Sequence, residues 1–162
     1  MHNIFFYLRH TFLKMKREET IDHHVRTAWH GISRYYNQQA AKFGGTMAIG
    51  FALLTIHGDD GTPATKIAPQ MGLEPRSLTR LLKSMEDKKL IIRKADKNDK
   101  RSVRIYLTKD GKKQRENAKD IVIGFNETVQ REISTQKLKV FFEVIQQIQA
   151  LTKRSVNYEK HN

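Results

Sequence analysis

The sequence has no cysteine among its 162 residues. Disulfide bonds, thiolate metal sites and a cysteine-based peroxide sensor are therefore excluded. It also lacks an apolar run long enough to cross a membrane, because Arg9 and His10 interrupt the segment Ile4–Leu8. No small-residue cleavage site follows that segment, so we expect a cytoplasmic protein with no membrane partner. An amphipathic N-terminal helix lying on a membrane surface is the alternative.

Acidic residues are few in this chain. Asp and Glu number 17 against 30 Lys and Arg, which gives a net charge of +13. The excess is concentrated between Thr62 and Lys119, where 17 basic and 7 acidic residues leave a charge of +10. A positive surplus of this size raises the local concentration of polyanions. Its concentration in one segment favours nucleic acid as the partner over charge that only maintains solubility.

Helical periodicity is clear from Thr20 onward. Apolar residues recur at spacings of three and four up to Phe43, and Gly44–Gly45 ends this first pattern. Thr46 can cap a second helix, which the turn cluster Gly58–Gly61 closes. One face of this second helix carries Met47, Phe51 and Leu54.

Two shorter helices joined by a tight turn are predicted next. The first spans Thr65–Gln70 and is short if Thr65 is its N-cap, because Pro69 cannot donate a backbone hydrogen bond. Gly72–Leu73 makes the turn, and Pro75 suits the first position of the second helix. The apolar stripe of the second helix is Leu78, Leu81, Leu82 and Met85.

A two-stranded antiparallel hairpin with a charged tip is predicted after these helices. Its first strand is Leu90–Arg93, and the polar loop Ala95–Arg101 leads to the second strand. Three residues of the second strand alternate with polar neighbours and are expected on one buried face: Val103, Ile105 and Leu107. The order helix, turn, helix, hairpin is typical of a winged helix-turn-helix, within a fold that is mainly α.

The chain is predicted to end in two long helices. Thr108 caps the first of them, and Ser134–Thr135 permits the break before the second. The apolar stripe of the first helix is Ala118, Ile121, Val122, Phe125 and Val129. The stripe of the second helix is Leu138, Phe141, Phe142, Ile145, Ile148 and Leu151.

The helix that begins at Pro75 has the shape needed to lie in a major groove about 12 Å wide. An arginine on its outer face can bond guanine with two donors, hydroxyls can reach bases or phosphates, and lysine suits phosphates. The predicted DNA-binding residues on this face are Arg76, Ser77, Thr79, Arg80 and Lys83. An ordinary solvated helix face is the alternative, but the Gly turn, the basic hairpin and the concentrated charge together favour nucleic-acid binding.

The segments 66–73, 77–82 and 85–93 resemble the DNA-binding core of MarR-type regulators. Asp99-Lys100-Arg101 matches their Asp-x-Arg signature, and Leu107–Gly111 matches the Leu-Thr-x-x-Gly that follows the wing. The resemblance covers roughly residues 20 to 155 in element order and is specific in its motifs from about Thr62 to Gly111. Two residues depart from the pattern: Glu74, where Ser or Asp commonly caps the recognition helix, and Pro69.

The resemblance implies a transcriptional repressor that binds double-stranded DNA as a homodimer on a pseudo-palindromic operator. It places Arg101 in or near the minor groove, with Lys97 and Lys100 beside it on the wing tip, and gives Asp99 the role of bracing the wing. It also implies that the terminal helices of two chains interlock. The expected division is a DNA-binding region at 46–114 and a dimerisation region at 1–45 and 115–162.

A small-molecule effector is a further hypothesis that the resemblance suggests. Aromatic side chains near the first two helices can line an apolar cavity beneath a basic rim, which suits an aromatic or lipophilic acid. The candidate lining residues are Trp29, His30, Tyr36 and Phe51, with Tyr35 and His57 nearby. Ordinary core or dimer-interface packing is the alternative for the same residues.

A metal site, an enzyme activity and a protein-binding module are the other functions to consider for this sequence. Adjacent histidines such as His23 and His24 point about 100° apart on a helix, so a metal site is not predicted. The sequence has no Gly-rich phosphate loop, no nucleophile elbow and no apolar pair of carboxylates, so neither an enzyme nor a cofactor is expected. A winged-helix module that binds proteins instead of DNA is the remaining alternative.

Overall fold

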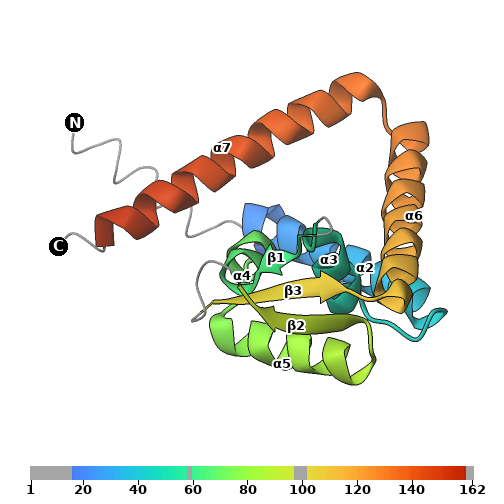
Figure 1. Ribbon diagram of the computed structural model, residues 1–162. Coiled ribbons are helices and arrows are strands. Elements are labelled where there is room, and N and C mark those ends of the chain that lie inside the picture. The colour runs from blue at the N-terminus through green and yellow to red at the C-terminus, as the bar shows by residue number, and fades with distance from the viewer. Residues whose placement is uncertain (1–15, 58–59, 97–101, 160–162) are drawn as a thin grey trace. The chain divides into compact units, whose positions relative to one another are not determined.

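The computed structural model describes residues 16–57, 60–96 and 102–159, with side chains described as far as residue 153 (Figure 1). The chain divides into two compact units, residues 1–118 and residues 119–162. The first unit holds a short 3-10 turn, four helices, a small sheet and the start of α6, and the second holds the rest of α6 and α7.

The first two long helices begin as the sequence predicts. α2 (Ile21–Ala41) is capped by Thr20, whose hydroxyl accepts from the His23 backbone at 3.4 Å. α3 (Met47–Thr55) is capped in the same way by Thr46. α3 is apolar all round, and the side that enters the core carries Ile49, Ala52 and Leu53. The face carrying Met47, Phe51 and Leu54 is only half-buried.

The prediction for the next helix was wrong at its start. α4 (Ala64–Met71) begins one residue before Thr65, and its N-cap is Pro63, which has no side-chain hydrogen bond to offer. Pro69 therefore lies inside the helix and removes an interior hydrogen bond. The helix ends at Gly72, whose φ of 62° lets the Leu73 amide reach the Ala68 carbonyl at 3.0 Å.

The sheet has three strands where the sequence predicted two. β2 (Ile91–Ala95) and β3 (Val103–Leu107) form the expected hairpin, and β1 (Thr62–Pro63) pairs with the other edge of β3. A strand of two residues is too short to show a period, so the sequence pattern could not indicate it. The strand boundaries also differ, because β2 starts at Ile91 and includes Ala95.

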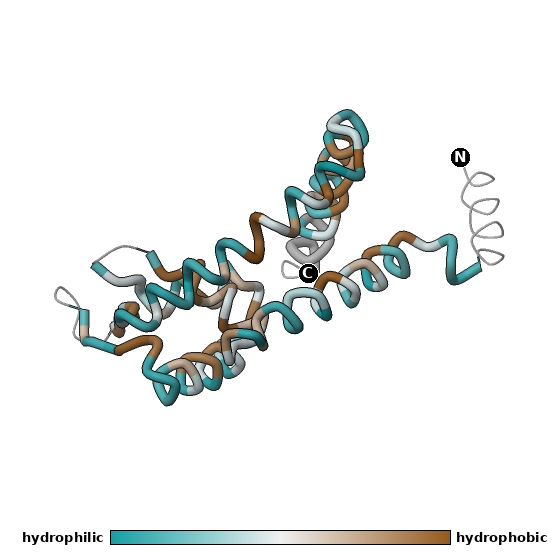
Figure 2. Tube along the Cα trace, turned by 90° about the vertical axis from the view of Figure 1, so that its right-hand side faces the viewer, coloured by the Kyte–Doolittle hydropathy of each residue, from teal (hydrophilic) through white to brown (hydrophobic). Residues whose placement is uncertain are grey.

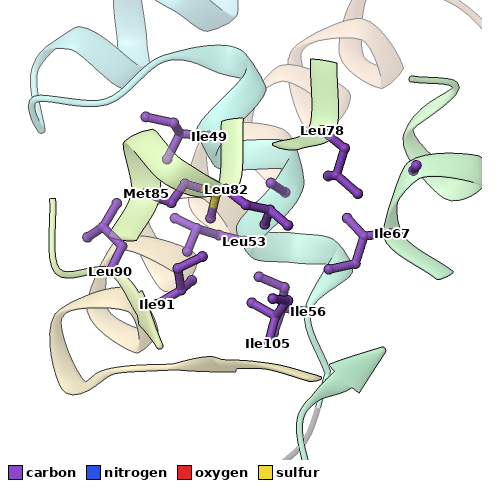
Figure 3. Close-up of a cluster of buried hydrophobic side chains, with 12 residues drawn as sticks. Ile49, Leu53, Ile56, Ile67, Leu78, Leu82, Met85, Leu90, Ile91 and Ile105 are labelled. Atoms are coloured by element: carbon purple, nitrogen blue, oxygen red, sulfur yellow. The ribbon is translucent and has the colours of Figure 1, made fainter. Parts of the chain in front are cut away.

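One core holds the winged part of the first unit together (Figure 3). It is built from α3, α4, α5 (Pro75–Asp87) and the sheet. The largest fully buried side chains are Leu53, Ile56, Ile67, Met85, Ile91 and Ile105. Ile105 was predicted to be buried together with Val103, but Val103 is 40% exposed because it lies at the tip end of the hairpin, beyond the core.

The corner between α5, β3 and α6 (Lys109–Glu132) is closed by a threonine and a glycine. The Thr108 hydroxyl donates to the Lys89 carbonyl at 2.7 Å and accepts from the Gly111 amide at 3.0 Å. Gly111 is buried, and a side chain at this position would collide with the backbone of Leu90. The Leu-Thr-x-x-Gly pattern therefore has a packing reason: it lets the first turn of α6 lie directly on the chain that leaves α5.

The second unit contains the remainder of α6 and α7 (Thr135–Glu159), separated by a break at Ser134. The break lies where the sequence predicts it, and the Ser134 hydroxyl accepts from the Lys137 amide at 3.4 Å and so caps α7. Hydrophobic and hydrophilic positions recur in turn along these helices (Figure 2). None of the described side chains from residue 119 to residue 153 is buried.

We expect Gly111→Ala to lower the free energy of unfolding by about 1–3 kcal/mol, because the added methyl group meets backbone that cannot rotate away. Gly124→Ala is the matched control on the same helix, since nothing lies within 4 Å of its added methyl group. That control should raise stability by up to about 1 kcal/mol through helix propensity. Denaturant unfolding of both variants measures the difference, and equal effects would contradict the packing explanation.

Candidate nucleic-acid interface

α5 is anchored to the domain along one face. Leu78, Leu82 and Met85 are 6%, 3% and 0% exposed and point into the core (Figure 3). The opposite side of the helix is exposed to solvent and carries all five predicted DNA-binding positions: Arg76, Ser77, Thr79, Arg80 and Lys83. Because three buried anchors fix the rotation of the helix about its axis, the direction of this polar face is fixed as well.

The cations on this face have no acidic partner among the described residues. The three described ion pairs all lie elsewhere, so the structure shows no neutralising contact for Arg76, Arg80 or Lys83. The Thr79 hydroxyl donates to the Pro75 carbonyl of its own helix at 3.0 Å. Its oxygen can therefore still accept a hydrogen bond, whereas its donor is already used.

The end of α5 is held as firmly as its middle. Lys89 adopts a left-handed conformation with φ of 58°, and the Leu90 amide reaches back to the Met85 carbonyl at 2.9 Å. Arg93 on β2 forms an ion pair with Glu86 at 3.0 Å, which ties the helix to the adjacent strand. α5 and the hairpin thus form one connected element.

The hairpin is described up to the base of its tip. β2 and β3 pair from Ile91 opposite Leu107 to Ala95 opposite Val103, and the Asp96 amide then donates to the Ser102 carbonyl at 2.9 Å. Four residues that the sequence places at the wing tip lie outside the described residues: Lys97, Asp99, Lys100 and Arg101.

An arginine that the sequence reasoning missed organises the stem of the wing. Arg104 on β3 pairs with Asp96 at 2.8 Å and donates to the carbonyls of Asp60 and Gly61 at 2.8 and 3.1 Å. The hydrogen bond to Asp96 raises the pKa of Arg104 further above its ordinary value, so this side chain stays charged. In the sequence, Arg104 alternates with the apolar residues of the second strand. That pattern predicts only that its side chain lies on the polar face of the strand.

A cavity of about 440 Å³ opens beside α2, α3 and α4 in the first unit. Its described lining is Trp29, Phe51, Leu54, Thr55, His57, Gln70 and Met71. Trp29, Phe51 and His57 were among the predicted lining residues, whereas His30 and Tyr36 are not part of the described wall. His30 is exposed on α2.

Tyr36 is buried and packs its ring edge-on against Phe51, with centroids 5.4 Å apart. Burial raises the pKa of the Tyr36 phenol above its ordinary value. Tyr36 is therefore not part of the described cavity lining but packs against Phe51, which is. The polar rim of the cavity is tied to the sheet, because the His57 amide donates to the Thr62 hydroxyl on β1 at 2.8 Å.

No group of three or more His, Asp or Glu side chains in the described part of the chain is placed to hold a metal ion. No helix within the described ranges has both the length and the apolar character needed to span a bilayer.

The geometry of α4, the turn, α5 and the β2–β3 hairpin defines a winged helix-turn-helix protein, with an unneutralised cationic face on its second helix. The MarR family model matches residues 46–103. The chain is also 32% identical over 114 residues to the organic hydroperoxide resistance transcriptional regulator of Bacillus subtilis, covering 70% of this chain and 78% of that protein. The chain belongs to the MarR family of DNA-binding transcriptional regulators.

Two other proteins are also similar to this chain. SarZ, an HTH-type transcriptional regulator of Staphylococcus epidermidis, is 31% identical over 81 residues, which are 50% of this chain and 55% of SarZ. The structure of the S. aureus MepR–DNA complex matches with a TM-score of 0.75 and 26% identity, covering 81% of this chain and 97% of that one. SarZ is thus a transcriptional regulator by its name, and the MepR structure contains DNA.

Proposed function

We propose that this chain is a homodimeric repressor that reads a pseudo-palindromic operator through α5 and the wing. The observation that carries the proposal is the α5 face, where Arg76, Arg80 and Lys83 are exposed without a described acidic partner. An exposed helix face that carries several unpaired cations raises the local concentration of anions and favours a polyanionic partner. The similarity to MepR, which was solved with DNA, supports a duplex as that anion.

The side chains have different proposed roles. Arg76 and Arg80 can each offer two parallel donors to the O6 and N7 atoms of guanine. Ser77 and Thr79 can contact base edges or phosphates, and Thr79 serves as an acceptor because its donor is used within α5. Lys83 suits a phosphate. The proposed contacts of the wing tip with DNA come from Lys97, Lys100 and Arg101, with Asp99 as a brace for the wing.

The terminal helices are proposed to pack against those of a second copy of the chain. The second unit has no buried side chain among those described, although it carries large exposed hydrophobic residues such as Phe141, Phe142 and Leu151 at 53–61% exposure. Monomeric soluble proteins rarely leave such apolar surface in water. We therefore assign dimerisation to residues 1–45 and 115–162 and DNA binding to 46–114, with half-sites about 34–36 Å apart on the operator.

The cavity beside α2 and α3 is the proposed effector site. Trp29, Phe51, Leu54 and Met71 supply apolar walls, and His57 supplies a polar group at the rim. An aromatic or lipophilic acid fits this chemistry. Because the His57 amide is bonded to Thr62 on β1, a ligand that moves the rim would also disturb the sheet that carries the wing.

Arg80→Ala should lower affinity for the preferred operator by about 1–3 kcal/mol and relax the base preference at one position of each half-site. Lys83→Ala should weaken binding to all sequences alike and reduce the slope of log K against log salt by about 1. Selection of bound sites from random duplexes, followed by titrations at several salt concentrations, measures both effects. A wild-type protein that shows no salt-dependent duplex binding would favour the protein-binding module instead.

Phe141→Glu combined with Phe142→Glu should convert the dimer to a monomer, because two charges would enter a surface that a second copy covers. The control is Gln146→Glu with Gln147→Glu, which adds the same charge at exposed positions of the same helix. Sedimentation velocity measures the association state. Monomeric wild-type protein, or equal effects of the two double variants, would contradict this dimer interface.

Occupation of the cavity can be followed directly, because Trp29 is the only tryptophan of the chain and lies in the cavity wall. A phenolic acid and a medium-chain fatty acid should each be tested for saturable change in Trp29 fluorescence and for release of DNA over the same concentration range. Leu54→Phe, which narrows the cavity, should weaken both responses together. A fluorescence change without release of DNA would separate binding from regulation and contradict the effector role.

A further inference from the structure

Arg104 connects three parts of the winged region. Its guanidinium spans the Asp96 carboxylate at the end of β2 and the carbonyls of Asp60 and Gly61, which precede β1. The side chains of Arg104 and Asp96 are only 26% and 12% exposed, so solvent screens this contact less than it screens a surface pair. Each of the three acceptors receives a different nitrogen of the same planar group, which fixes their relative positions.

A second contact on the same face of the sheet reinforces this connection. Tyr106 lies two residues along β3, and a side chain on Gly61 would come within 2.8 Å of its ring. The Lys94 ammonium group from β2 lies over the Tyr106 ring, 5.2 Å from its centre. The φ of 70° at Gly61 and its missing side chain allow the turn to approach β3 this closely.

The hairpin needs such an attachment. Two-stranded hairpins are marginally stable alone, and β1 adds only two residues of pairing to β3. The core anchors the hairpin at Ile91 and Ile105, whereas Val103 and Ala95 at the tip end are exposed. Arg104 and Asp96 lie at this outer end, where none of the described apolar side chains is buried.

We propose that Arg104 is a positioning residue for the wing: through Asp96 and the carbonyls of Asp60 and Gly61 it sets the angle at which the tip meets DNA. This inference rests on the proposed DNA-binding function. Arg104 acts through the stem and makes no contact with a base in this role. Its loss leaves α5 in place but lets the tip turn away from the groove beside the recognition site.

Asp96→Asn gives the sharpest test, because the two explanations predict opposite signs. If Arg104 bound DNA directly as a free cation, removing the neighbouring negative charge would strengthen binding. If Arg104 instead positions the wing, weakening the Arg104–Asp96 pair should lower operator affinity by roughly tenfold, the effect of one misplaced charged hydrogen bond. Tighter binding by Asp96→Asn than by the wild type would overturn the proposal.

Arg104→Lys supplies an independent variant that keeps the charge. A lysine ammonium on a flexible stem cannot span a carboxylate and two carbonyls at once, so this variant should also lose roughly tenfold in affinity. Lys113→Gln is the charge control, since it removes an exposed cation of α6 and should change affinity by less than about threefold. Wild-type affinity in Arg104→Lys would overturn the proposal even if Asp96→Asn failed to fold.

Footprinting separates positioning from general destabilisation. Hydroxyl-radical protection should be lost in the minor groove flanking each half-site, while protection of guanine N7 in the major groove by α5 is retained. Uniform loss of both protections would indicate a structural role only and contradict the proposal. The DNA-binding function is tested separately by the wild type and Arg80→Ala, so a failure of that function is recognised before the Arg104 variants are interpreted.

Discussion

The packing of Leu78, Leu82 and Met85 against α3 and the sheet is the constraint on which the site depends. Burying each of these side chains stabilises the domain by about 1.5–3 kcal/mol relative to exposure. The same burial fixes the rotation of α5 about its axis. A shift by one residue would turn the apolar stripe about 100° from the core and would carry the arginines with it.

The C-terminal end of α5 and the wing stem are positioned by polar contacts around this core. Thr108 and Gly111 close the corner where α5 gives way to β2 and α6 begins, and Arg93 ties the strand to the helix. At the opposite end of the hairpin, the Arg104 side chain on β3 contacts the Asp96 carboxylate at the end of β2 and the turn before β1. Apolar packing therefore fixes which face of α5 is exposed, and hydrogen bonds and ion pairs tie the helix to the hairpin and the hairpin to the turn before β1.

The helices toward the two ends of the chain, α2, α6 and α7, bury few of their own side chains. α2 buries only Tyr36 among its 21 residues, and the second unit has no buried side chain among those described. Their stripes are amphipathic in sequence, so the apolar surface is patterned for packing and is too extensive for solvent. The proposed second chain would supply a surface with the matching pattern, and α2, which contributes Trp29 to the cavity wall, belongs to the proposed dimerisation region.

The sequence by itself determined the helices with strong period, their threonine caps, the anchoring leucines of α5 and the family, because these features depend on local spacing and on short motifs. It did not indicate β1, the start of α4 at Ala64, the exposure of Val103 or the Arg104 contacts with Asp96 and the Asp60–Gly61 turn. β1 and the Arg104 contacts with the Asp60–Gly61 turn join residues more than 40 positions apart, and α4 starts directly after β1. The Arg104–Asp96 pair forms across the hairpin, and the exposure of Val103 depends on where the core ends along the strand. Sequence spacing describes which side of an element is apolar, whereas only the folded chain decides which distant backbone groups come within reach of an arginine.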